Sequence, residues 1–431
     1  MARDGLLSSL TGAIVFDCLP FSRMQSILDR MPRLIRPIRR VAVLAIRVAG
    51  VSLVLVGVAV GSGLRAQAPR RLPIIAGNGM VHVLVAIDGT VSTWGYPRRV
   101  ATNPSLGDGT RPGDKVDEPR LLAGVGDIID AAVGDTQVLL LKRDGTVLAW
   151  GWNSECEVGT GDGKTKLAPV PIAGLRNVRQ IAAGKNVSGA LLEDGTVWLW
   201  GWGQKGQLAN GLWGWQTPCA KVPTKVEGLT GVKKLSLGDV SALALKDDGT
   251  VWGWGTNANG ELCDGTTDHR PRPVQMKGIS NAVDAVVEYN SIVVLADGTV
   301  RMCGVNQLNA LGDPAEEGGE QLTPYKVPGL TGVRSARMNS TTTIVQLADG
   351  TLRGWGMGYY GALGDGGYAG FTAKPHPPTG LGPVLVHYMS GGSSYAIRAD
   401  GTVMAWCIPT TSGNALFVLV PTAVFTVKLS E

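Results

Sequence analysis

The chain has 431 residues with a formal net charge of +5, and 61 of its residues are glycine. Glycine is therefore about twice as frequent as in an average protein, whereas the charged share of 17% is below the usual quarter. A hydrophobic content of 44% is high enough to bury a core. The composition excludes a disordered chain and favours turn-rich, all-β structure.

The positive charge is confined to the N-terminal end. Residues 1–47 contain eight Arg and three Asp, which leaves 32 of the 40 basic and 32 of the 35 acidic residues for positions 48–431. A protein that grips nucleic acid by neutralising phosphates needs a basic folded surface. We therefore expect no nucleic-acid partner.

The N-terminal part divides into a basic segment, 1–40, with Met24 and Met31 as alternative starts, and an apolar segment, 41–68. Residues 48–60 (VAGVSLVLVGVAV) follow an Arg-rich stretch and precede the small residues Ala66-Gln67-Ala68. A basic region, an apolar run of about 7–15 residues and a small-residue site are typical of a secretory signal.

This pattern predicts export, to the periplasm or out of the cell. The alternative is a retained membrane anchor at residues 41–63, which approach the roughly 20 residues that span a bilayer. An uncleaved anchor is the only membrane contact that we expect.

A tripeptide, Asp-Gly-Thr, recurs seven times at intervals of 49 to 56 residues, each time after an apolar run. Six residues after the Asp stands a Trp in six copies, and Cys303 in the fifth. Asp-Gly between apolar runs is a strong hairpin signal, because a type I′ turn needs positive φ at both central residues. We interpret these recurring residues as structural: Asp88, Asp144, Asp194, Asp248, Asp297, Asp349, Asp400, Trp94, Trp150, Trp200, Trp254, Trp355 and Trp406.

Each copy carries three more strand-like segments. In the fourth copy they are PTKVEGL (223–229), VKKLSLG (232–238) and SALALK (241–246). One small antiparallel sheet per copy cannot bury both of its faces alone, so the copies must stack, and radial stacking gives a propeller. We expect residues 69–431 to form an all-β, seven-bladed β-propeller of four-stranded antiparallel blades.

The two ends of this region suggest how the ring closes. The chain finishes with PTAVFTVKLSE (421–431), which begins a repeat without reaching its Asp-Gly-Thr, and the folded part opens with the end of a repeat at 74–90. We expect the N- and C-terminal strands to pair in one blade, which removes free sheet edges.

Three motifs resemble those of the regulator-of-chromosome-condensation repeat family, including its bacterial seven-bladed members. They are the apolar-DGTV-x-x-WG segment, the LGDGT loop at 106–110 and the P-x-x-V-x-GL strand, and the resemblance covers roughly residues 74–429. It implies a seven-bladed propeller. A bacterial propeller with a related repeat is a secreted β-lactamase inhibitor that uses loop aromatics on one face.

Other functions within the family fit less well. The eukaryotic founder acts in guanine-nucleotide exchange and chromatin binding, which remains an alternative although the export signal and the neutral body argue against it. A plant light sensor of the family has a Gly-Trp-Arg-His-Thr motif that is absent from this sequence.

The aromatic residues outside the repeat pattern are the candidate binding residues. Trp213 and Trp215 lie in the stretch 202–222, where other repeats have short polar loops. Further candidates are Tyr96, Trp152, Trp202, Tyr359, Tyr360, Tyr368 and Phe371. Exposed loop aromatics are typical of binding hot spots, although in long loops they also cover blade edges.

The leading hypothesis is therefore a monomeric, exported propeller that acts as a protein-binding scaffold or inhibitor through one face. The sequence does not identify the partner. The alternative is a cell-wall glycan-binding or glycan-active protein.

Catalytic and metal-binding patterns are absent from the sequence. The four histidines, His82, His269, His376 and His387, are not placed near a nucleophile in a known pattern, so we expect no enzyme. The six cysteines lack C-x-x-C spacing, so we expect no metal site and no cofactor.

Four cysteines occupy positions of the repeat that other residues normally hold. Cys156, Cys263 and Cys407 replace glycines, and Cys303 replaces the Trp. In an oxidising compartment one or two disulfides can form, but spacing leaves their connectivity open.

Overall fold

The computed structural model describes residues 42–48, 51–57 and 71–429, except 79, 96–105, 110–115, 313–318, 369, 391 and 409–416. The chain divides into two compact units, Met1–Arg70 and Arg71–Glu431. In the first unit β1 (Ala42–Val48) and β2 (Val51–Gly57) pair as an antiparallel hairpin.

The basic segment 1–40 and the small-residue site at 66–68 lie outside the described residues. Among the residues that are described, no helix is long and apolar enough to cross a membrane.

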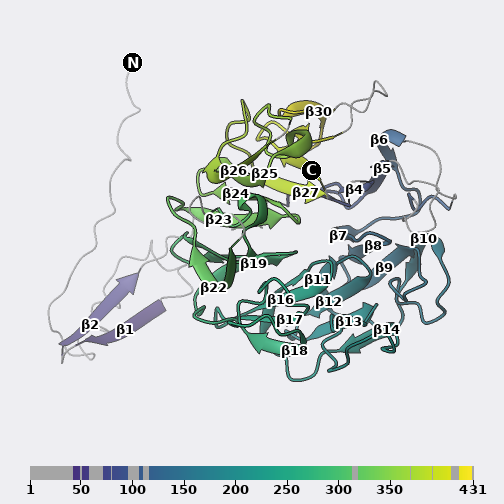
Figure 1. Ribbon diagram of the computed structural model, residues 1–431, viewed down its shortest axis with the longest axis horizontal. Helices are drawn as coiled ribbons and strands as arrows, with labels where there is room; N and C mark the ends of the chain where they lie inside the picture. Colours follow the sequence, from purple (N-terminus) through teal and green to yellow (C-terminus); the bar gives the residue numbers. More distant parts are fainter. Residues whose placement is uncertain are drawn as a thin grey trace, which may run out of the picture. The chain divides into compact units, whose positions relative to one another are not determined.

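The second unit contains seven four-stranded antiparallel sheets, the blades, which follow one another in chain order (Figure 1). This confirms the predicted all-β, seven-bladed propeller. Blade 1 comprises β3 (Ile74–Gly77), β4 (Val81–Val85), β5 (Val91–Gly95) and β6 (Val116–Leu121). Blade 2 comprises β7 (Ile128–Val133), β8 (Gln137–Lys142), β9 (Val147–Gly151) and β10 (Lys166–Pro171). Blade 3 comprises β11 (Val178–Ala183), β12 (Val187–Leu192), β13 (Val197–Gly201) and β14 (Ala220–Lys225).

The remaining blades have the same four-strand order. Blade 4 comprises β15 (Val232–Leu237), β16 (Ser241–Lys246), β17 (Val251–Gly255) and β18 (Arg270–Gln275), and blade 5 comprises β19 (Ala282–Val287), β20 (Ser291–Leu295), β21 (Val300–Val305) and β22 (Glu320–Lys326). Blade 6 comprises β23 (Val333–Met338), β24 (Thr342–Leu347), β25 (Leu352–Met357) and β26 (Phe371–His376). Blade 7 comprises β27 (Val386–Ser390), β28 (Ser393–Ile397), β29 (Thr402–Trp406) and β30 (Thr422–Thr426). Two short 3-10 turns, η2 (Gln307–Asn309) and η3 (Tyr359–Gly361), lie in loops of blades 5 and 6.

The core lies between neighbouring blades. The second strand of each blade is almost entirely buried, as in β8 and β16, because it is covered by a blade on either side. One apolar cluster joins Leu139 and Leu141 of blade 2 to Ile181 and Trp200 of blade 3. The innermost strands contact one another in sequence around the ring, for example β7 with β11 and β11 with β15.

The predicted closure, in which strands from both termini share one blade, is wrong. Blade 1 is built from β3 to β6 and blade 7 from β27 to β30, each a contiguous piece of chain. The reason is that the proline-led strand pairs with the Trp-Gly strand that precedes it, as β14 does with β13. The sequence repeat is therefore offset from the blade by one strand, and both terminal blades are complete.

The ring closes by packing between complete blades. Strand β27 contacts β3, and the Tyr388 hydroxyl donates a hydrogen bond of 2.8 Å to the Pro73 carbonyl. Ile75 and Val81 of blade 1 share an apolar cluster with Tyr395 and Ile397 of blade 7.

In each blade an Asp-Gly-Thr turn joins the second strand to the third, with similar contacts in every copy. In blade 3, Oδ1 of Asp194 accepts hydrogen bonds from the backbone N–H of Thr196, at 2.9 Å, and from its hydroxyl, at 2.6 Å. Gly195 between them has a φ of 75°, which glycine adopts readily. These hydrogen bonds hold the pKa of Asp194 below its usual value.

Acid is expected to weaken all seven turns together. The pKa is lowered at every turn aspartate, so the stabilisation is present above the ordinary value of 3.8 and is lost as the pH falls through the lower folded value. Carboxyl-carbon NMR should give midpoints below 3.8 for these residues. Midpoints at or above that value would contradict the turn geometry.

Candidate binding surface on the long-loop face

One end of the propeller carries the long loops. In each blade the connection from the third to the fourth strand lies at the same end as the connection from the first to the second, because antiparallel neighbours alternate in direction. The Asp-Gly-Thr turns lie at the opposite end. We call the first end the long-loop face.

The long loops share an internal hydrogen bond. The side-chain oxygen of Asn257 accepts from the N–H of Leu262 at 2.8 Å, and Asn153 and Val158 form the same contact at 2.9 Å. Cys156 and Cys263 have φ of 67° and 54°, in the left-handed region. This explains why most other repeats have glycine at these two loop positions.

The repeated Trp joins each blade to the loop before it. Nε1 of Trp200 in blade 3 donates to the carbonyl of Glu157 in the blade 2 loop at 2.9 Å, and Trp254 donates to the Gln207 carbonyl at 2.9 Å. A Cβ at Gly159 would lie only 2.6 Å from Nε1 of Trp200. The loop glycine and the following blade's Trp therefore form one interlocking pair.

The pair is replaced by a covalent bond between blades 4 and 5. Cys263 stands at the loop position of Gly159, Cys303 stands at the Trp position, and the two form a disulfide. A second disulfide, Cys156–Cys219, joins the loops of blades 2 and 3. Cys407 is buried and not disulfide-bonded.

The most exposed aromatic side chain of the described residues, Trp215, lies on the blade 3 loop, 202–219, beside two further exposed apolar side chains. Trp215 is 82% exposed, Leu212 48% and Trp213 38%. Trp213 stacks on His269 of the blade 4 loop, with ring centroids 4.3 Å apart and planes at 13°. We call Lys205, Leu212, Trp213, Trp215 and His269 the aromatic platform.

Lys205 lies over both indoles of the platform. Its Nζ is 5.9 Å from the Trp213 ring centroid and 5.6 Å from that of Trp215. An ammonium group over an indole face is attracted by the ring's negative quadrupole. The two tryptophans and the cation thus form one group at the surface.

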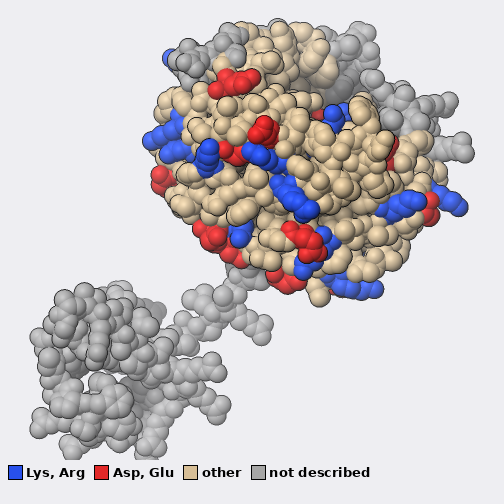
Figure 2. Space-filling view, turned by 60° about the horizontal axis from the view of Figure 1, so that its bottom comes forward, with Lys and Arg blue, Asp and Glu red and all other residues tan. Residues whose placement is uncertain are grey.

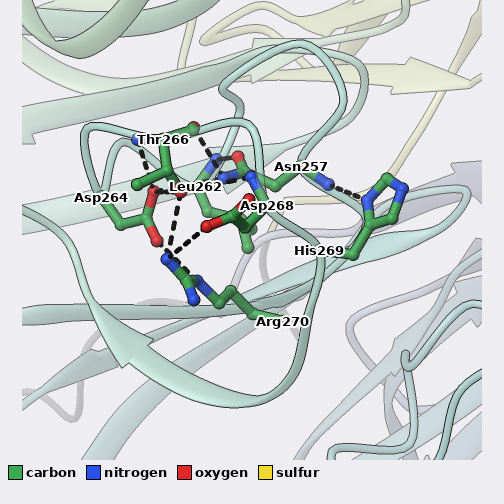
Figure 3. A network of polar contacts seen from close by, with 7 residues as sticks. All are labelled: Asn257, Leu262, Asp264, Thr266, Asp268, His269 and Arg270. Carbon is green, nitrogen blue, oxygen red and sulfur yellow. Dashed lines mark hydrogen bonds and ion pairs between the residues drawn. The ribbon is translucent and has the colours of Figure 1, made fainter.

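A polar network under the platform fixes His269 (Figure 3). Nδ1 of His269 accepts the backbone N–H of Asn257 at 3.1 Å, and the Asn257 amide donates to Asp264 at 3.2 Å. Asp264 also accepts from Nε of Arg270 at 2.7 Å and from the Thr266 hydroxyl at 2.7 Å. Although burial opposes the effect, these hydrogen bonds lower the pKa of Asp264, so the network is charged and tightly bonded.

Backbone contacts also hold the loop that carries the tryptophans. The N–H of Gly211 donates to the Pro271 carbonyl at 2.8 Å, and the N–H of Gly214 donates to the Gln204 carbonyl at 2.9 Å. The disulfide at Cys219 anchors the end of the loop. A partner that binds here therefore does not have to order the backbone of this loop.

The other predicted aromatics lie elsewhere. Tyr360 contacts Tyr368 and Phe417, with centroids 5.7 and 4.7 Å apart, and lies 6.5 Å from Tyr359. We call Tyr359, Tyr360 and Tyr368 the tyrosine cluster; its residues are 40%, 48% and 47% exposed. It belongs to the loop of blade 6, whereas the platform lies where blades 3 and 4 meet.

The remaining candidates stand alone. Trp152 donates to the Ser154 hydroxyl at 2.6 Å within its own loop. Trp202 is partly buried at the start of the blade 3 loop, and Phe371 is 47% exposed at the start of β26. Tyr96 lies outside the described residues. The structure therefore brings Trp213 and Trp215 together but not the full set.

Carboxylates gather near the innermost strands on the same face. Asp135, Asp239 and Glu288 follow β7, β15 and β19. Burial, and then the charge of Asp239, raise the pKa of Glu288 well above its ordinary value and also raise that of Asp135. Within the described part of the chain, no group of three His, Cys, Asp or Glu side chains is arranged to hold a metal ion.

Two other strongly shifted groups are enclosed by protein. Burial raises the pKa of Glu157 to about 7 and lowers that of His387 to about 3. Glu157 is 0% exposed and His387 3% exposed, so a substrate in solution does not reach either side chain. Their shifted pKa values are the consequence of burial between blades.

Surface charge is mixed in sign. In the view of Figure 2, Lys and Arg side chains alternate with Asp and Glu over a mostly uncharged surface. This view shows no broad area of a single sign.

Part of the propeller sequence matches a known repeat. Residues 144–191, 194–245 and 248–289 match the regulator of chromosome condensation (RCC1) repeat. The ultraviolet-B receptor UVR8 of Arabidopsis thaliana is 27% identical over 311 residues, which are 69% of this chain and 68% of the receptor. The human E3 ubiquitin-protein ligase HERC2 is 29% identical over 253 residues, 56% of this chain but only 5% of that ligase.

Solved structures share the fold. Prp20p of Saccharomyces cerevisiae has a TM-score of 0.68 at 21% identity, covering 79% of this chain and 87% of that protein. Human WBSCR16 has a TM-score of 0.67 at 23% identity, covering 78% and 94%. This chain is therefore a seven-bladed propeller that carries regulator of chromosome condensation (RCC1) repeats at residues 144–191, 194–245 and 248–289.

Proposed function

We propose that the chain is an exported, non-catalytic scaffold that binds a partner protein through the aromatic platform. The observation that carries the proposal is the exposure of Trp215, at 82%, on a loop held by a disulfide and by the stacking of Trp213 on His269. Buried hot spots at interfaces are rich in Trp, and a rigid loop avoids the ordering cost of binding. An indole that is so exposed on a rigid loop is suited to binding a partner protein.

Two solved structures of one similar protein, yeast Prp20, support a role in binding. One comes from a study of its binding to Gsp1p and histones, and in the other it is bound to Kap60. These partners belong to Prp20, and the low identity carries over only the fold. What supports the proposal is that this fold presents protein-binding loops on a rigid ring.

Affinity capture tests the proposal directly. The full chain, tagged at its C-terminus, is used as bait in envelope and secreted fractions of the organism that makes it. We expect a partner that the wild type retains and the Trp213→Ala/Trp215→Ala variant loses, because the variant removes both indoles without touching the core.

A control is Tyr359→Ala/Tyr368→Ala in the tyrosine cluster, whose side chains are also exposed but have no Lys or Arg over their rings among the described residues. It should retain the same partner. Recovery of the partner by the platform variant, or capture of nothing by the wild type, would reject the platform as a protein-binding site.

Export is supported by the two disulfides between blades, because disulfides persist in oxidising compartments. Protein taken from the native organism, alkylated at once and digested, should show the Cys156–Cys219 and Cys263–Cys303 peptides cross-linked. Alkylated thiols at all four positions would place the chain in a reducing compartment and reject export.

A further inference from the structure

We propose that the aromatic platform recognises an acidic segment of the partner protein, with its carboxylates on Lys205 and Arg272 and an apolar side chain on Trp215. This rests on the proposed function, because it specifies the chemistry of the partner at the same surface. It extends the platform by one residue, Arg272 of β18.

The first support is the local balance of charge. Residues 202–225 contain Lys205, Lys221 and Lys225 but no Asp or Glu, although the whole body is neutral. Strand β18 contains two further cations, Arg270 and Arg272. A local excess of cations around exposed indoles favours a partner of the opposite charge.

The second support is that two of these cations are available. Arg270 is occupied by Asp264, at 2.7 Å, and Asp268, at 3.6 Å. In the described part of the structure neither Lys205 nor Arg272 forms an ion pair, and Nζ of Lys205 makes no hydrogen bond. An ammonium has three N–H donors, so Lys205 can still donate to a carboxylate while it lies over the indoles.

The third support is position. A Cβ added at Gly211 would lie 2.6 Å from Nη2 of Arg272, so the guanidinium lies against the turn that leads into Leu212 and Trp213. Lys205 lies over the rings of Trp213 and Trp215. Both cations thus lie against the loop that carries the apolar side chains, and a short peptide with acidic residues beside an apolar one suits this arrangement.

The same surface suits nucleic acid less well. Phosphate backbones are bound by many cations along a surface, whereas this group offers two free ones, and the view of Figure 2 shows no broad basic area. The tyrosine cluster supplies an internal comparison, since no Lys or Arg of the described residues lies over its rings.

The test uses the full chain and a phage-displayed library of short random peptides. Selected peptides are sequenced for the wild type, for Lys205→Glu/Arg272→Glu, for the neutral Lys205→Gln/Arg272→Gln, and for Trp215→Ala. Thermal unfolding of each variant establishes that it is folded. We expect wild-type selection to enrich Asp and Glu over Asn and Gln beside an apolar residue, and high salt to weaken it.

The charge-reversed variant should lose this enrichment and favour Lys and Arg, and the neutral variant should bind selected acidic peptides about tenfold more weakly. Trp215→Ala should lose the apolar preference. Selection without acidic enrichment, or equal enrichment with the charge-reversed variant, would overturn the inference. Because affinity capture depends only on the two tryptophans, a partner that is captured but docks through a neutral or basic segment would leave the proposed function standing.

Discussion

The double variant Cys263→Gly/Cys303→Trp is expected to fold and, in reducing buffer, to be more stable than the wild type. It rebuilds between blades 4 and 5 the glycine–Trp pair that joins blades 2 and 3 through Gly159 and Trp200. The new indole should donate to the Glu261 carbonyl, which now accepts from the Ser291 hydroxyl at 2.5 Å.

The expected size of the effect follows from the disulfide. The bond closes a stretch with a sequence separation of 40, and such a link stabilises by about 4 kcal/mol through loss of entropy in the unfolded chain. Reduction removes the disulfide's stabilisation from the wild type and leaves two thiols where other blades have an indole. In the variant the packing of the Trp replaces it, and only Cys156–Cys219 remains to be reduced.

Urea unfolding with and without reductant measures the difference, and Cys263→Ser/Cys303→Ser is the matched control because it has neither link. The control should unfold like reduced wild type at this interface. A double variant that is no more stable in reductant than this control would show that the disulfide does not stand in for the Trp.

Much of the fold, but not all of it, is predictable from the sequence. The sequence reveals the repeat period, the turn aspartates and the replacement of Trp by Cys303, because each recurs or fails to recur at a fixed spacing. The partner of Cys303 was not visible, because it lies in the loop of the preceding blade and only stacking brings the two together. The error over ring closure has the same origin: spacing does not reveal with which neighbour the proline-led strand pairs.

The candidate site was predictable only in part. Trp213 and Trp215 stood out because repetition does not explain them. His269 and Arg272 belong to the next blade, more than fifty residues later, and nothing in their own sequence context links them to an exposed indole. The one usable signal was the absence of acidic residues from 202–225, which marks the basic character of the loop but not the stacking of Trp213 on His269.

The substitutions Trp200→Ala and Trp215→Ala are expected to separate structural from binding tryptophans. Trp200 is fully buried and Trp215 is 82% exposed. Truncating Trp200 leaves a cavity between blades 2 and 3 and removes the donor to the Glu157 carbonyl, at an expected cost of about 3–5 kcal/mol. Truncating Trp215 should change stability by less than about 0.5 kcal/mol and should weaken partner binding.

Urea unfolding of both variants, with Trp200→Phe as control, measures these costs. The phenyl ring keeps part of the packing but has no N–H, and the Ser188 hydroxyl still donates to the Glu157 carbonyl at 2.8 Å, so its loss should be clearly smaller than that of the alanine variant. A large loss for Trp215→Ala would mean that this indole supports its loop and is not held out for a partner. Because Lys205 lies over Trp213 as well as Trp215, the loop has a second indole to hold the cation, and we therefore expect the loss to fall on binding alone.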